Sequence, residues 1–284
     1  MKSIASFLMA TVLILGGVPC YAGTSNGMTL YDSFNGKSIN ADKWVGYEWL
    51  SDTANRVARE SVRWVEDRRL RLGISACACT TCPEGSSITV QERLIALDPT
   101  IQDATAIQAI AEIGQLTVVG SDSDANKEIP AQARMRIMKF FFNNTENPGN
   151  AIGDVIAWIG VRRTSGSTNP TNTLTVTGNV SVCTDETCTE SLTYGQVDIT
   201  TLRISAARRP SMANLYMEWD AQNHQFIFKC NNKTQGISYS EDWATSPPWI
   251  KHMSLRAEGM VPNDATGDRP KASIDSYIDN IWYK

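Results

Sequence analysis

The sequence predicts an all-β protein built as one large antiparallel sandwich. Three observations lead to this fold class. Short segments alternate apolar and polar side chains with a period of two, as half-buried antiparallel strands do. Clusters of Asn, Asp, Gly and Pro separate these segments and are typical of hairpin turns. Neither a shift in composition nor a Pro/Ser-rich linker divides the chain, so we expect a single sandwich rather than two modules.

The expected strands follow one another along the chain. Residues 61–65 and 70–74 both alternate, and Glu66-Asp67-Arg68 between them predicts a hairpin. Further strands are expected over residues 155–161, 173–177, 215–220 and 226–228. The stretch from 104 to 116 is ambiguous, because its isoleucines recur at every third position, as in a helix, while its first half also alternates like a strand.

The first residues have the pattern of a secretory signal peptide. Lys2 precedes the apolar run from Ile4 to Val18, and small residues at Cys20 and Ala22 suit positions −3 and −1 of a cleavage site. This run is shorter than the ~20 residues that span a bilayer. We therefore expect residues 1–22 to be a signal peptide and residues 23–284 to be a single domain. The mature protein is expected to be periplasmic or extracellular, with no membrane span.

The cysteines suit an oxidising compartment. Removal of the signal peptide leaves six of them, an even number. Cys183 and Cys188 enclose four polar residues and are expected to form a disulfide across a tight loop. Two further bridges are expected, in which Cys230 pairs with one of three neighbours that the sequence does not distinguish: Cys77, Cys79 and Cys82. A zinc site made by these four thiolates is the alternative.

Composition and charge exclude several classes of function. The formal net charge of −4 excludes a protein that binds nucleic acid through its overall charge. The sequence has neither a Walker loop nor a GxGxxG fingerprint, so nucleotide chemistry has no support. Its two histidines, His224 and His252, are too few for a multi-histidine metal centre, and we expect both to be surface residues rather than bases.

Both ends of the chain resemble the ends of concanavalin A-like lectin/glucanase jelly rolls. The segment from Tyr31 to Trp44 (YDSFNGKSINADKW) is similar to their entry motif, and the segment from Ala272 to Tyr283 (ASIDSYIDNIWY) is similar to their closing strand. Residues 62–74 and 215–228 are similar to internal hairpins, the latter to one of laminin-G-like members. The resemblance implies an antiparallel two-sheet jelly-roll sandwich with adjacent terminal strands. Four side chains are expected between the sheets: Phe34, Trp44, Ile278 and Trp282.

The resemblance does not extend to the catalytic motif of the glucanases. Family 16 glycoside hydrolases carry Glu-x-Asp-x-x-Glu on one strand, with the two glutamates as nucleophile and acid/base. The nearest string here, from Glu218 through Asp220 to Asn223, ends in an amide, which cannot act as a general acid. No catalytic residue is therefore assigned.

Three aromatic residues in a polar loop are the candidate ligand-binding residues. Tyr239, Trp243 and Trp249 lie among serines, prolines and carboxylates, and such rings can stack on sugars. The alternative is that they pack inward over the edge of the sandwich. Some members of the resembled superfamily hold a structural calcium ion near the joined termini, and its implied ligands here are Asp32, Asn35 and Asp279. No other cofactor is expected.

We therefore expect a secreted, non-catalytic, lectin-like protein that binds a carbohydrate or another cell-surface component. Two alternatives stay open. One is a glycoside hydrolase or lyase acting on a polysaccharide with an atypical carboxylate pair, and the other is a structural protein of the envelope. Two carboxyl groups within ~5 to 9.5 Å of each other on an open sheet face would favour the enzyme.

Overall fold

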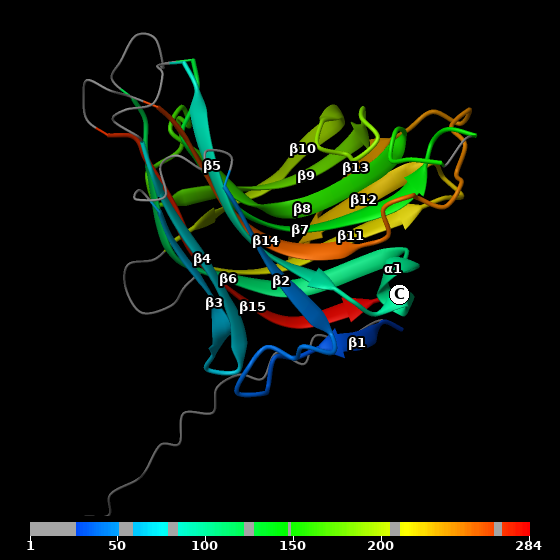
Figure 1. The fold of residues 1–284 in the computed structure, drawn as a ribbon, viewed down its shortest axis with the longest axis horizontal. Coiled ribbons are helices and arrows are strands. Elements are labelled where there is room, and N and C mark those ends of the chain that lie inside the picture. Colours follow the sequence, from blue (N-terminus) through cyan, green and yellow to red (C-terminus); the bar gives the residue numbers. More distant parts are fainter. Residues whose placement is uncertain are drawn as a thin grey trace, which may run out of the picture.

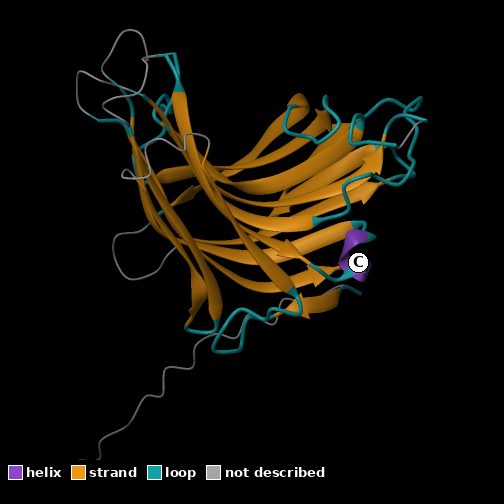
Figure 2. Cartoon of the chain, in the orientation of Figure 1, coloured by secondary structure: helices purple, strands orange, loops and turns teal. Residues whose placement is uncertain are grey.

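The protein is a sandwich of two antiparallel β-sheets (Figures 1 and 2). This computed structural model describes seven ranges of the chain: 27–50, 59–78, 85–121, 128–146, 149–204, 211–263 and 269–284. In these ranges the only α-helix is α1 (Pro99–Gln102). None of the helices described is long and apolar enough to cross a membrane. The predicted signal peptide, residues 1–22, lies outside the described residues.

The first sheet contains eight strands. They are β1 (Thr29–Asp32), β3 (Arg59–Glu66), β4 (Arg69–Cys77), β6 (Ala106–Val119), β11 (Ser211–Asp220), β12 (Gln225–Cys230), β13 (Lys233–Ser238) and β15 (Lys271–Tyr283). Their hydrogen-bonded order is β13-β12-β11-β6-β15-β4-β3, and β1 also pairs with β15. The first and last strands of the chain are therefore neighbours, which confirms the expected closure of the jelly roll.

The second sheet contains seven strands. They are β2 (Trp44–Leu50), β5 (Ser87–Ala96), β7 (Gln132–Asn143), β8 (Asp154–Thr164), β9 (Thr173–Cys183), β10 (Ser191–Arg203) and β14 (Met253–Pro262). Their order is β10-β9-β8-β7-β14-β5-β2. All pairings in both sheets are antiparallel, so the structure confirms the predicted jelly-roll sandwich.

The ambiguous stretch is a strand. Strand β6 lies in the middle of the first sheet and pairs with β11 on one side and β15 on the other. It buries Ile107, Ala109, Ala111 and Ile113 on one face, which is a period of two. Backbone pairing on both sides therefore decides between the two periodicities.

The turns follow the expected chemistry. Asp67 and Arg68 between β3 and β4 both have positive φ, 50° and 61°, as the two central residues of a type I′ hairpin turn require. His224, with φ of 48°, closes the turn between β11 and β12. The expected hairpins at 61–74 and 215–228 are thus both present.

The space between the sheets is filled by one large hydrophobic cluster, which includes three of the four expected side chains, Phe34, Trp44 and Ile278. Trp282 is the exception. A bulge at Asn280, whose φ is 48°, changes the phase of β15, so Ile281 faces the core. Trp282 then packs with Met28 and Ala106 in a separate cluster, which corrects the prediction.

The second sheet presents a long face away from the first sheet. On β7 and β14 the residues Met135, Ile137, Leu255 and Ala257 belong to the core between the sheets. Because successive side chains alternate, the residues between them point to the opposite side. We call this side the outer face of the second sheet. Figure 1 shows β7, β8, β9 and β14 running side by side there as long, bent strands.

Candidate functional site

The three predicted ligand-binding aromatics do not form one exposed platform. Tyr239 is only 6% exposed and belongs to the core, where its hydroxyl accepts a 3.0 Å hydrogen bond from Nε1 of Trp219. Trp243 is half-buried and stacks on Tyr239 with 5.5 Å between ring centroids. Trp249 is 58% exposed. The prediction is therefore wrong for Tyr239, because the chain after β13 turns this ring into the end of the sandwich.

Trp249 lies at the border of the outer face of the second sheet. Its backbone N–H and that of Ile250 donate to the carboxylate of Asp154, the first residue of β8, at 3.0 and 2.8 Å. Asn143 holds the same carboxylate from β7 with a 2.8 Å hydrogen bond. The side chain of Ile250 packs on a small hydrophobic cluster formed by Met138, Phe140, Ile156, Trp158 and Cys183.

Four arginines gather at the middle of this outer face. Arg256 on β14 lies directly between Arg93 on β5 and Arg136 on β7 in the strand register. Arg134 is two residues from Arg136, on the same side of β7. We call these four residues the arginine cluster. The sequence shows the alternation of Arg134 and Arg136 with core residues, but nothing in it places β5, β7 and β14 side by side, so the cluster becomes visible only in the structure.

Glu258 is the carboxylate that partners the arginine cluster. It is 5% exposed and forms ion pairs with Arg134 and with Arg136, the latter at 2.7 Å. Burial alone would raise the pKa of Glu258, but the nearby positive charges of Arg134 and Arg136 hold it below its usual value. Three guanidinium groups, those of Arg134, Arg136 and Arg256, act on this one carboxylate, so positive charge is in excess among them in a protein whose formal net charge is −4.

Burial and neighbouring positive charges lower the pKa values of two arginines in the cluster. Burial, followed by the charge of Arg134, lowers the pKa of Arg136 to about 10. Burial, followed by the charges of Arg136 and Arg93, also lowers the pKa of Arg256 well below its usual value. Guanidinium groups resist deprotonation so strongly that Arg136 and Arg256 remain charged at neutral pH. The lowered values therefore indicate an electrostatic cost of the folded state.

The cluster has donor capacity that the protein does not use. Within the described part of the chain, Nε of Arg134 and Nε of Arg136 are buried without a hydrogen-bond partner, as is Nε2 of His252. His252 was expected at the surface. It is instead largely enclosed, edge-on against Phe140 with 4.9 Å between ring centroids. Burial, followed by the charges of Arg256 and Arg93, lowers the pKa of His252 to about 3, so the ring is neutral at pH 7.

Neighbouring side chains hold the arginines in place. The guanidinium carbons of Arg134 and Arg136 both lie 5.6 Å from the centre of the Trp158 ring on β8. Gly160 is the residue of β8 directly opposite Arg136, and a Cβ there would lie 2.8 Å from Cβ of Arg136. Arg256 donates from Nε to Ser254 at 3.0 Å. The cluster is thus built by the packing of β7, β8 and β14 and is not a chance collection of flexible surface residues.

Polar side chains continue the outer face across β9 and β10. Asn179 lies opposite Trp158, and Thr177 donates a 2.9 Å hydrogen bond to Asp198 on β10. Asp198 and Glu258 are carboxylates of this face, on strands four positions apart in the sheet. That separation is about 19 Å at the usual strand spacing. It is far beyond the ~5 to 9.5 Å that a pair of hydrolytic carboxyl groups requires.

Comparison with protein-family models and with curated proteins finds no match. Solved structures similar to this chain include an endo-β-galactosidase from Clostridium perfringens that releases GlcNAcα1-4Gal, with 12% identity and a TM-score of 0.46 over 90% of this chain. This chain spans 62% of that protein. A variant of LamA from Zobellia galactanivorans in complex with laminaritriose and laminaritetraose has 14% identity and a TM-score of 0.47, over 91% and 99% of the two chains. The carbohydrate recognition domain of Emp47p has 7% identity and a TM-score of 0.38, and the match covers 91% of this chain and 97% of that one.

The string that resembles a glucanase motif has a structural role. Glu218 lies on β11 of the first sheet and accepts a 2.7 Å hydrogen bond from the hydroxyl of Tyr216. Asp220 accepts from the backbone and the side chain of Asn223 and from the side chain of Gln225, and these bonds lower its pKa. The contacts of Asp220 close the turn between β11 and β12.

The implied calcium ligands do not fit a calcium ion. Both carboxylate oxygens of Asp32 accept hydrogen bonds within the protein, from the backbone of Phe34 at 2.9 Å and from Nε1 of Trp44 at 2.7 Å. The amide of Asn35 donates to Ser33. Burial raises the pKa of Asp279, which opposes the ionised form that calcium needs. Among the described residues, no three His, Cys, Asp or Glu side chains gather as metal ligands.

One predicted disulfide is confirmed. Cys183 and Cys188 are bridged, with 4.9 Å between their Cα atoms. Cys77 and Cys230 are free thiols, on strands β4 and β12, which lie four positions apart in the first sheet. That distance, about 19 Å, excludes both a bridge and a shared zinc ion between these two residues. Cys79 and Cys82 lie outside the described residues, so a bridge between these two stays a prediction.

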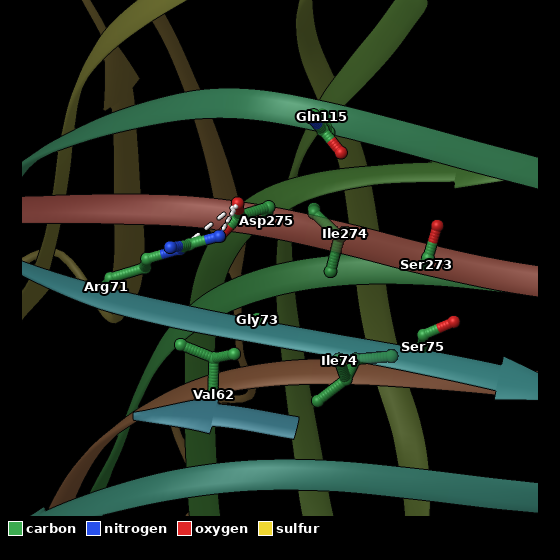
Figure 3. Close-up of a pocket in the computed structure, with 9 residues that line it drawn as sticks. All are labelled: Val62, Arg71, Gly73, Ile74, Ser75, Gln115, Ser273, Ile274 and Asp275. Carbon is green, nitrogen blue, oxygen red and sulfur yellow. Dashed lines mark hydrogen bonds and ion pairs between the residues drawn. The ribbon is translucent and has the colours of Figure 1, made fainter. Parts of the chain in front are cut away.

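A shallow hollow of about 250 Å³ on the outer face of the first sheet offers a contrast to the arginine cluster (Figure 3). Its cation, Arg71, donates to both oxygens of Asp275, at 2.9 and 2.7 Å, and forms a further ion pair with Glu66. Arg71 also covers the ring of Trp64, which is 48% exposed. The charge of Arg71 is therefore fully compensated within the protein.

Proposed function

We propose that this protein is exported and binds a carbohydrate along the outer face of its second sheet without hydrolysing it. The observation that carries the proposal is the combination of Trp249 and the arginine cluster on this face. Sugars are recognised by an aromatic ring against their apolar face together with hydrogen-bond donors that reach their oxygens. Trp249 supplies the exposed ring, and the arginine cluster supplies unused donors.

The distance between these two features favours a ligand with several sugar residues. Asp154, which holds the backbone of Trp249, is six residues along β8 from Gly160, which lies opposite Arg136. Six residues of a strand extend about 20 Å. A single monosaccharide is too short to bridge this distance, whereas an oligosaccharide that follows β8 reaches both ends.

The absence of hydrolysis is proposed on the basis of the carboxylates. Among the described carboxylates of this face, Glu258 is enclosed by arginines that keep it ionised, so it is unsuited to donate a proton. The carboxylate of Asp154 accepts hydrogen bonds from Asn143 and from the backbone of Trp249 and Ile250. Asp198 lies about 19 Å from Glu258 across the sheet. Export is supported by the pattern of residues 1–22, and the Cys183–Cys188 disulfide is compatible with it.

The test uses the chain from residue 23 onward, probed against an array of neutral and charged glycans. Hits are then titrated by calorimetry with oligosaccharides of increasing length. We expect affinity to rise with length and Trp249→Ala to lower it at least tenfold, as expected for an aromatic contact at the centre of a site. Trp64→Ala is the matched control, because Trp64 is similarly exposed on the other sheet. Failure to bind any glycan, or equal affinity of Trp249→Ala and the wild type, would contradict the proposal.

A second measurement addresses catalysis. The bound oligosaccharide is incubated with the protein and followed by mass spectrometry. We expect it to remain intact. Products that have gained water would show hydrolysis, and products with a new double bond would show a lyase, so either result would overturn the non-catalytic part of the proposal.

A further inference from the structure

We propose that the arginine cluster binds the carboxylate or sulfate groups of an acidic glycan. This inference rests on the proposed function and specifies the chemical class of its ligand. It predicts that the sugar over Arg134, Arg136 and Arg256 carries a negative charge, whereas the sugar at Trp249 need not.

Charge balance is the first argument. Two arginines of the first sheet are compensated by carboxylates: Arg71 has two such partners, and Arg69 pairs with Glu112 at 2.6 Å. In the arginine cluster, Glu258 is shared by Arg134 and Arg136, while Arg256 lies directly opposite Arg136. Like charges directly opposite each other on neighbouring strands are destabilising. An anionic ligand on this face would remove that cost.

The geometry of the donors is the second argument. A guanidinium presents a planar fork of donors that matches the paired oxygens of a carboxylate or a sulfate. Arg134 and Arg136 each use a terminal nitrogen on Glu258, and their Nε atoms have no partner among the described residues. Both groups are already oriented by the Trp158 ring. Little side-chain entropy is therefore lost when an anion binds.

Size and context favour a glycan over a smaller anion. The cluster spans β5, β14 and β7, which are three adjacent strands, and the same face continues to Trp249. An isolated phosphate or sulfate ion would use only one part of it. A nucleic acid would need positive charge over a larger surface than four arginines on a protein with net charge −4.

The experiment compares three oligosaccharides of equal length: a polyuronate, a sulfated galactan and a neutral β-glucan. Each is titrated into the wild type, Arg136→Gln, Arg134→Gln and the control Arg71→Gln at two salt concentrations. We expect one or both acidic probes to bind at least tenfold more tightly than the neutral probe. Each variant of the cluster should reduce the affinity for the acidic probe at least tenfold, and Arg71→Gln should not. The difference between polyuronate and sulfated galactan identifies the charged group.

Salt dependence is an independent readout. Affinity of the wild type for the acidic probe should fall as salt rises, and less steeply in Arg136→Gln, because one ion contact is missing. Thermal unfolding of each variant shows whether it is folded, and Arg134→Gln provides a second test should Arg136→Gln unfold. Equal binding of neutral and acidic glycans would overturn this inference but leave the proposed function intact. Failure to bind any glycan would overturn both. Single-stranded DNA of equal charge is a further probe, and tighter binding of this DNA than of the acidic glycan would overturn the assignment of the ligand as a glycan.

Discussion

Arg256 and Arg136 lie directly opposite each other on the neighbouring strands β14 and β7, and both side chains point away from the core. Two positive charges in this position lower the stability of a sheet. Placement of Arg93 on the other side of Arg256 adds a third charge to the same row. Natural sequences tend to violate such local rules at functional sites. This row of like charges is therefore the feature of the structure that most favours a binding role for the outer face.

Glu258→Gln is predicted to destabilise the protein and to strengthen its binding of anions. The substitution removes the carboxylate that pairs with Arg134 and Arg136 and leaves their charges uncompensated. Loss of one partner from a buried pair costs about 3 to 5 kcal/mol. Urea unfolding measures this loss, and calorimetry with the acidic probe measures the gain in affinity. A variant as stable as the wild type would show that Glu258 does not offset the repulsion.

Addition of the acidic oligosaccharide is expected to raise the melting temperature of Glu258→Gln more than that of the wild type. A ligand that binds only the folded state stabilises it in proportion to the logarithm of its concentration over the dissociation constant. The neutral β-glucan at equal concentration is the control. Equal shifts with both probes would argue against a role for charge.

Gly160→Ala is predicted to disturb the arginine cluster without removing a charge. The new methyl group would overlap the backbone oxygen of Met135 and lie 2.8 Å from Cβ of Arg136, so the backbone of β7 must move and carry Arg136 with it. Overpacking of this kind costs about 1 to 3 kcal/mol. We expect lower stability together with weaker binding of the acidic probe. Gly166→Ala, where a Cβ would meet nothing within 4 Å, is the control.

His252 is predicted to make the folded state less stable at acidic pH. Its pKa is lowered to about 3 by burial and by two arginine charges, whereas an unfolded histidine titrates near 6.5. Between these values the unfolded chain binds a proton that the folded protein does not, so stability falls as the pH decreases from 6.5 towards 3. The slope from this one residue approaches about 1.4 kcal/mol per pH unit.

The variant His252→Phe isolates this contribution. We expect its stability to fall less steeply with decreasing pH in that window than the stability of the wild type, as measured by urea unfolding at a series of pH values. His224→Phe serves as the control, because it removes the histidine of the turn between β11 and β12. Parallel pH profiles for wild type and His252→Phe would mean that His252 is as easily protonated in the folded state as in the unfolded state.

Cys230 is predicted to resist alkylation in the folded protein. Its thiol is fully buried, and burial raises its pKa to about 11, so little reactive thiolate forms at neutral pH. Mass spectrometry after treatment with iodoacetamide should show an unmodified Cys230 in native protein and a modified one in urea. Peptides that contain Cys183 and Cys188 should remain linked until a reductant is added. A linked peptide that contains Cys230 would contradict this arrangement.

The sequence predicted the fold well where the information is local. The turn at Asp67 and Arg68 needed only its own residues, and the strands around Trp158 and Trp219 were visible from alternation. It failed where one residue changes the phase of a strand. The bulge at Asn280 moved Trp282 out of the core, because a shift of one position exchanges the two faces of a strand.

The site was hidden from the sequence for a different reason. Arg136 and Arg256 are 120 positions apart, and their opposition depends on which strands are neighbours. Tyr239 was a reasonable candidate as a loop aromatic, but whether a loop turns a ring inward depends on the space left at the end of the sandwich. Features that arise from pairing between distant strands therefore require the structure.

The position of β15 has a consequence for the order in which the chain folds. This strand lies between β6 and β4, in the interior of the first sheet. Without it that sheet consists of two separate parts, each with an unpaired edge. Folding of the first sheet must therefore wait for the 13 residues of β15, and contacts between such distant parts of a chain form slowly. A nascent or C-terminally truncated chain would expose these edges and would be prone to aggregate until β15 is in place.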